Sequence, residues 1–200
     1  MIEKDHDITE DTRLRIRNSI AYDDWSGNEK IYYENKQLKY EKSKDNCGDG
    51  ISKNYSRKGV LRRERKRING CKAPAVIVVA NFYPNGHLKL KKESYEDRKG
   101  QSIEESYYPN GNREYKMNFN NNQPEGAQYF YNKQDKLRTI DYFTNGTKTK
   151  ATYYEGGQQA FTLFFKNGMV QRGIYYQNGN EYNIPNAEIV KINNQKSLYI

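Results

Sequence analysis

Two cysteines are the first residues of this sequence whose type and spacing could do chemistry. Cys47 and Cys71 lie twelve positions before and twelve positions after Gly59. A hairpin that turns at Arg57-Lys58-Gly59 would bring both cysteines to its open end, within the Cα separation that a disulfide requires. The spacing therefore predicts a Cys47–Cys71 disulfide. Two unrelated reduced thiols are the alternative.

A basic run is the second such feature, since Leu61–Arg67 reads LRRERKR. Side chains alternate between the faces of a strand, so the three odd-numbered arginines share one face at ~6.6 Å spacing. Guanidinium groups bind carboxylates and phosphates through paired hydrogen bonds. A solvated edge strand whose like charges prevent edge-to-edge pairing is the alternative. The candidate partner-binding residues are Arg63, Arg65 and Arg67 on one face and Arg62 and Lys66 on the other.

Residues arranged for catalysis or metal binding are missing from the sequence. The two histidines, His6 and His87, are 81 positions apart, whereas a catalytic zinc needs three protein ligands. Carboxylate pairs such as Glu104-Glu105 occupy successive positions and point to opposite faces of a strand. Phosphate-loop, dinucleotide and serine-nucleophile motifs do not occur. We therefore expect a non-enzyme with no metal and no cofactor.

The composition indicates a thin β-structure. Only 34% of the residues are hydrophobic and 30% are charged, which is too polar for an ordinary two-layer core. The 19 Tyr and 7 Phe argue against disorder, because disordered chains contain few aromatic residues. Tyrosine suits a single sheet, since its ring covers apolar area while its hydroxyl stays in water.

A repeat of eleven residues gives the fold class. Aromatic pairs recur at Tyr142-Phe143, Tyr153-Tyr154, Phe164-Phe165 and Tyr175-Tyr176. Asn-Gly and Gly-Gly supply the positive φ angles of a two-residue type I′ hairpin turn. The expected turn-forming glycines are Gly86, Gly111, Gly146, Gly157, Gly168 and Gly179. Nine residues between turns make one strand, so we predict an all-β, elongated antiparallel meander of hairpins, largely single-layered. In the hairpin at Asn167-Gly168, Phe161 should face Ile174.

The domain organisation follows from the same pattern. Residues 1–12 form an acidic tail, and residues 13–200 form a single β-repeat domain. Within that domain, 13–80 is an irregular N-terminal part, 81–180 holds the regular repeats and 181–200 is a C-terminal cap. Residues 13–22 and 187–192 are expected to cap the sheet. Residues 75–82, an unbroken apolar run, should be the best-buried strand, covered on both faces. Residues 42–80 are either a degenerate repeat or an insertion.

Three segments carry a family resemblance. Phe82-Tyr-Pro-Asn-Gly86, Tyr107-Tyr-Pro-Asn-Gly111 and Tyr175-Tyr-Gln-Asn-Gly179 resemble the variant MORN repeat of bacterial YwqK-like antitoxins. The similarity covers roughly residues 31–180. It implies a bacterial immunity protein that neutralises a toxin by direct binding, and the basic run suggests an acidic toxin surface. A structural or surface scaffold of MORN type is the alternative.

Charge and localisation complete the expectations. The formal net charge of +9 would also attract nucleic acid or anionic lipid. We do not expect nucleic acid as the partner. The tyrosine pairs recur with every repeat, as the fold requires, and do not gather near the basic run, where they could stack on bases. The longest apolar run, residues 73–80, is far shorter than the ~20 residues of a membrane-spanning helix. A disulfide in a mature chain would favour the periplasm or envelope; otherwise the cytoplasm is expected.

Overall fold

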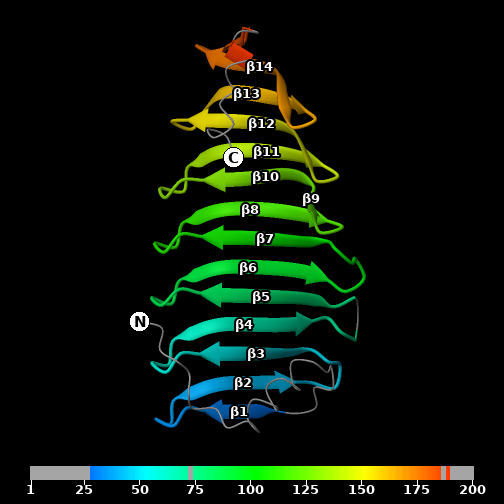
Figure 1. Cartoon of the computed structure of the whole chain (residues 1–200). Helices are drawn as coiled ribbons and strands as arrows, with labels where there is room; N and C mark the ends of the chain where they lie inside the picture. Colours follow the sequence, from blue (N-terminus) through cyan, green and yellow to red (C-terminus); the bar gives the residue numbers. More distant parts are fainter. Residues whose placement is uncertain (1–27, 72–73, 186–187, 190–200) are drawn as a thin grey trace.

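The computed structural model describes residues 28–71, 74–185 and 188–189. One antiparallel sheet contains all its strands, which follow one another in chain order (Figure 1). The short strand β9 pairs only with β8, and the next strand of the sheet after β8 is β10. The strands are β1 (Glu29–Tyr32), β2 (Leu38–Lys44), β3 (Gly50–Tyr55), β4 (Leu61–Ile68), β5 (Val76–Phe82), β6 (Leu88–Tyr95), β7 (Ser102–Tyr107), β8 (Arg113–Asn120), β9 (Gln123–Pro124), β10 (Gly126–Tyr131), β11 (Leu137–Thr144), β12 (Thr147–Glu155), β13 (Gln158–Lys166), β14 (Met169–Gln177) and β15 (Asn180–Asn183). The prediction of an all-β, single-layered meander is confirmed.

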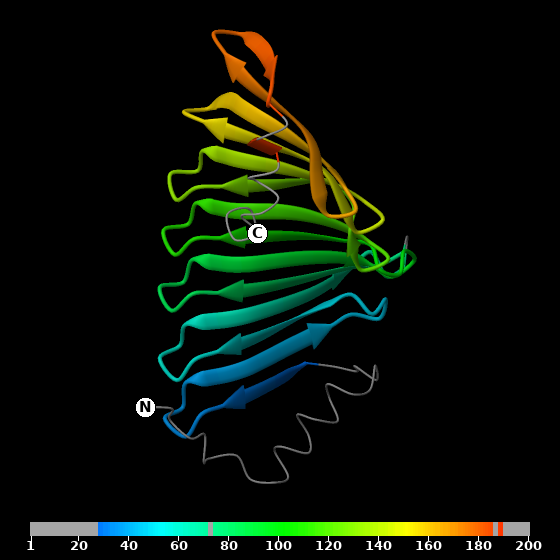
Figure 2. The same ribbon diagram turned by 45° about the horizontal axis from the view of Figure 1, so that its top comes forward.

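The sheet is curved and twisted along its length (Figure 2). Eight strand pairs contain a register shift, seven of them at an aromatic pair and one, between β3 and β4, at the single Tyr55. Each extra residue bends its strand and increases the local right-handed twist. In the β13–β14 hairpin the shift makes Phe164 pair with Arg172, and Phe161 then faces Tyr175. The expected pairing of Phe161 with Ile174 is wrong, because period-2 alternation does not reveal an inserted residue.

Two kinds of turn join the strands. Asn145-Gly146, Gly156-Gly157, Asn167-Gly168 and Asn178-Gly179 have positive φ at both positions, as type I′ turns require. The loops at residues 34–36, 57–59, 84–86, 109–111 and 133–135 instead have three residues, with positive φ only at the third.

Two Asn-Gly pairs therefore form a turn of a different type from the one expected. Gly86 and Gly111 keep positive φ, but Asn85 and Asn110 do not. A proline precedes each of these asparagines, and its fixed φ suits the first central position of a type I turn. The glycine then occupies the left-handed position that follows such a turn in a three-residue hairpin loop.

Hydrogen bonds from these loops join each hairpin to the next. The hydroxyls of Tyr33, Tyr83 and Tyr108 donate to main-chain carbonyls 22 to 24 residues ahead. The amide groups of Asn35, Asn85 and Asn110 donate to carbonyls of the following loop. In these three hairpins the second aromatic residue is tyrosine, and its hydroxyl reaches the neighbouring hairpin.

This tyrosine link can be tested by removing one hydroxyl. Tyr83→Phe leaves the Tyr107 carbonyl without its 2.9 Å partner, and we expect a loss of about 1 kcal/mol in the free energy of unfolding. Tyr32→Phe is the matched control, because Tyr32 is exposed. The measurement is the urea midpoint of each variant. Equal midpoints for the two variants would show that the link does not stabilise the sheet.

The best-buried part of the molecule lies at its C-terminal end. Leu163 and Val170 pack with Ile184 and Ile189, which follow the last strand and cover one face of β13 and β14. Gly173 allows this approach, since a Cβ there would lie 2.5 Å from Ile184 Cδ1. The expected cap at residues 187–192 is described only at 188 and 189, whereas residues 1–12 and 13–22 lie outside the described residues.

Strand β5 is not the best-buried strand. Its side chains are half-buried except for Ala80, which is 8% exposed. A single-layered sheet offers a β-branched side chain only its neighbours on the same face. The expectation of cover on both faces for residues 75–82 was therefore wrong.

Candidate functional site

The register places the three odd-numbered arginines on one face of β4. Arg63 lies between Asn54 and Asn81, and Arg65 lies between Ser52 and Val79. Arg67 follows two residues along, between Gly50 and Ile77. We call this side of the sheet the arginine face. The shared face agrees with the strand alternation, whereas the role of these arginines in binding stays a prediction.

Arg67 has a role inside the protein. Its Nε and Nη2 donate to the two carboxylate oxygens of Glu96 at 2.8 and 2.9 Å, and Nη1 lies 3.9 Å from Asp49. The hydrogen bonds from Arg67 hold the pKa of the Glu96 carboxyl below its usual value. Charge-assisted pairs of this two-pronged geometry are the stronger ones. Arg67 therefore ties β4 to the loop after β6, and sequence alternation gave no indication of this partner.

The predicted disulfide is present beside Arg67. Cys47 and Cys71 are bonded, with their Cα atoms 5.0 Å apart. Asp45 accepts hydrogen bonds from the amides of Cys47 and Asp49 within its own loop. Asp49 in turn accepts from the amides of Asn69 and Gly70 in the loop after β4. We call this group the disulfide corner; it joins the loops after β2, β4 and β6.

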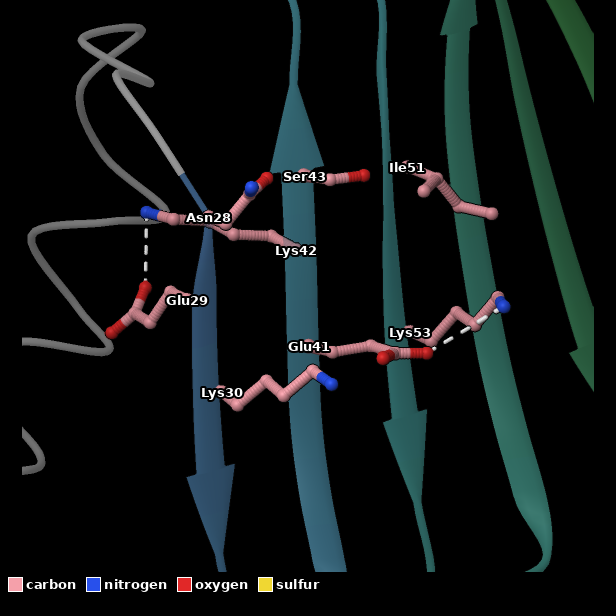
Figure 3. A pocket seen from close by; sticks show the side chains of 8 residues that line it. All are labelled: Asn28, Glu29, Lys30, Glu41, Lys42, Ser43, Ile51 and Lys53. Atoms are coloured by element: carbon pink, nitrogen blue, oxygen red, sulfur yellow. Dashed lines mark ion pairs between the residues drawn. The ribbon is translucent and has the colours of Figure 1, made fainter.

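The opposite side of the sheet carries lysine and glutamate alternately, and we call it the lysine–glutamate face. Across β1 to β4 the row runs Lys30, Glu41, Lys53, Glu64. Figure 3 shows the first three members side by side, with the 3.5 Å ion pair between Glu41 and Lys53 dashed. The row continues with Lys91, Glu105 and Lys116 on β6 to β8. Opposite charges directly across strands attract, so this face is largely neutralised within itself.

Of the two remaining candidate cations, Lys66 lies on the expected face, opposite Arg65, whereas Arg62 does not. Lys66 lies on the lysine–glutamate face and pairs with Glu64 at 2.7 Å. Arg62 is the extra residue of the β3–β4 bulge, between the pairs Asn54–Arg63 and Tyr55–Leu61. Arg62 therefore does not follow the alternation that would have placed it on the same face as Glu64 and Lys66.

The arginine face over β1–β7 is not neutral. Its cations are Lys42, Lys44, Arg63, Arg65, Arg67 and Lys92, and its carboxylates within the same strands are Glu29 and Glu104. Glu29 pairs with Lys42 at 3.0 Å, and Glu96 binds Arg67 from the adjoining loop. Glu104 accepts a hydrogen bond from Tyr115. Cations therefore exceed carboxylates on this face.

Tyrosine hydroxyls hold two of the glutamates. Tyr55 donates to Glu41 at 2.6 Å, and burial together with this bond raises the pKa of Tyr55 to about 12. Burial and the bond to Glu104 raise the pKa of Tyr115 to about 12 as well. Both hydroxyls thus remain protonated donors at neutral pH, and they fix the carboxylates in place.

A buried ion pair on the arginine face was not predicted. Asp141 is 7% exposed and lies between Gln128 and Ala151. Its Oδ2 binds Lys148 Nζ at 2.7 Å, whereas its Oδ1 is buried without a hydrogen-bond partner. Lys148 also lies over the rings of Phe143 and Phe165 at 5.8 Å. The sequence offered one indication of this pair, since Asp141 is an acidic residue directly before the aromatic pair Tyr142-Phe143.

Several kinds of site are not found in the described part of the chain. No group of three or more His, Cys, Asp or Glu side chains there could hold a metal ion. No helix among the described residues is long and apolar enough to span a membrane. The cleft of about 520 Å³ beside β1 is lined mainly by charged side chains, among them Glu29, Lys42, Glu41 and Lys53, which pair with one another (Figure 3).

Comparison with known protein families identifies two of the hairpins. The MORN repeat variant matches residues 25–43 and 101–121. The chain thus contains a variant MORN repeat at two places. The described part of the first match and all of the second each contain a three-residue loop between two strands. The loops at 57–59, 84–86 and 133–135 share this geometry, so the MORN-like hairpins extend beyond the two matches. A search of curated proteins finds no match to the chain. MORN repeats support a binding or scaffold role.

Proposed function

We propose that this chain is a non-catalytic bacterial immunity protein that neutralises a toxin by direct protein–protein binding. The observation that supports it is the sheet itself, which is a wide single layer whose two faces are mostly accessible and differ in charge balance. Such a surface suits a stable interface of roughly 1,200–2,000 Å², with a few tyrosine or arginine anchors supplying most of the energy. The resemblance to YwqK-like antitoxins supports the toxin as partner.

The disulfide supports a site of action in the envelope. Disulfides form and persist in oxidising compartments, and the disulfide corner ties three loops of the N-terminal hairpins. A MORN-type surface scaffold in the same compartment is the second candidate, because the same sheet could join two partners without neutralising either.

The experiment is co-expression with the product of the adjacent gene. We expect that product, directed to the periplasm, to stop growth alone and to be harmless when this protein is present. The two proteins should co-purify at equal stoichiometry. A neighbour that is harmless alone, or that stops growth with this protein in excess, would contradict the immunity function. Co-purification without protection would favour the scaffold.

A further inference from the structure

We propose that the arginine face over β2–β6 binds an acidic segment of the partner protein that crosses the strands. This inference rests on the protein-binding function proposed above, and adds the surface and the chemistry of the partner. The choice of face follows from charge. On the lysine–glutamate face Lys53 pairs with Glu41 and Lys66 pairs with Glu64, so cations and carboxylates nearly balance there. On the arginine face Lys42 pairs with Glu29 and Arg67 with Glu96, and cations still exceed carboxylates.

The cations lie in a row with a definite spacing. Lys42 on β2 pairs with Ser52, and Ser52 pairs with Arg65 on β4. Arg65 pairs with Val79, and Val79 pairs with Lys92 on β6. Because neighbouring strands lie ~4.8 Å apart, the three cations are ~10 Å apart along a line across the strands. Ser52 and Val79, which separate the three cations, have shorter side chains than the cations do.

That spacing favours a polypeptide that crosses the strands. A polyproline II segment with an acid at every third residue presents carboxylates ~9 Å apart, and a helix with acids seven residues apart presents them ~10.5 Å apart. Arg63 is exposed one row away, between the amide side chains of Asn54 and Asn81. These amides supply neutral donors and acceptors for a peptide backbone.

Arg65 already interacts within the protein: after the hydrogen bonds from Arg67, its charge also helps to hold the pKa of the Glu96 carboxyl below its usual value. The surplus positive charge is thus summed over Lys42, Arg65, Lys92 and Arg63 together, and it does not depend on any one of these side chains lacking a partner. Binding platforms for single-stranded nucleic acid combine cations with stacked aromatic rings. The side chains that flank Arg63 and Arg65 are Ser52, Asn54, Val79 and Asn81, which favours a polypeptide.

The test uses two double variants with the same net charge in the full chain. R63Q/R65Q removes two cations from the arginine face, and K53Q/K66Q removes two cations from the other face of the neighbouring strands β3 and β4. The probe is a short fluorescein-labelled polyglutamate peptide followed by fluorescence anisotropy. We expect R63Q/R65Q to weaken binding about three- to tenfold, and K53Q/K66Q less than about twofold. Both variants should keep the thermal midpoint of the parent protein.

Four outcomes would overturn the proposal. Equal weakening by the two variants would mean that the probe senses only net charge. Tighter binding of a single-stranded DNA of equal charge would assign the face to nucleic acid. Carbodiimide crosslinks from Lys42 or Lys92 to the acids of residues 3–11, without probe binding, would assign the face to the chain's own acidic segment. Protection from the toxin that survives R63Q/R65Q but not K53Q/K66Q would reject this surface and leave the immunity function standing.

Discussion

Replacing both cysteines by serine is expected to lower the free energy of unfolding of the N-terminal hairpins by about 3–4 kcal/mol. The disulfide closes a loop with a sequence separation of 24, and the chain-entropy model assigns a loop of this size about that stabilisation. The Cys47 loop and the Asp49 contacts to Asn69 and Gly70 should open together once the bond is gone. Amide hydrogen exchange of β3 and β4 measures the loss.

The far end of the sheet is an internal control for this experiment. Each strand is hydrogen-bonded only to its neighbours in the sheet, and the stability of repeat arrays is built from such nearest-neighbour terms. Exchange in β12–β14 should therefore stay unchanged in the double serine variant. A uniform loss along the sheet, or no loss, would show that the disulfide corner does not act locally. In the parent protein, alkylation of either thiol without a reductant would contradict the disulfide itself.

Lys148→Met is expected to destabilise the protein by about 2–4 kcal/mol. The Asp141 side chain is 10% exposed, and Lys148 is the cation that binds its Oδ2. Removing one member of a buried pair leaves the other charge uncompensated, which costs more than the pair itself contributes. Methionine keeps the apolar stem against Phe143 and Phe165, so the loss reports mainly on the charge. The urea midpoint is the measurement.

A second substitution separates charge from packing in this pair. Asp141→Asn in the Lys148→Met background removes the stranded carboxylate and should restore part of the stability. Asp141→Asn alone completes the double-mutant cycle, and we expect the two single losses to sum to more than the loss of the double variant. Additive losses would show that Asp141 and Lys148 do not depend on each other.

Local chemistry determined much of this fold. Asn167-Gly168 and Gly156-Gly157 form their turns because these residues adopt positive φ at little cost, whichever neighbours surround them. The eleven-residue beat, the single layer and the Cys47–Cys71 hairpin follow from the same short-range rules. The shared face of Arg63, Arg65 and Arg67 follows as well, because alternation is a property of any strand.

Contacts between strands decided the rest. The bulge that places Phe161 opposite Tyr175 forms where β13 and β14 pair and twist together. Whether the charge of a cation is balanced within the protein depends on the carboxylates that lie near it in the folded sheet. Lys66 has Glu64 on its own face, and Arg67 has Glu96 from a loop 29 residues ahead. Electrostatic pairing acts through space over a few ångströms, so only the register of the folded sheet determines which charges remain to bind a partner.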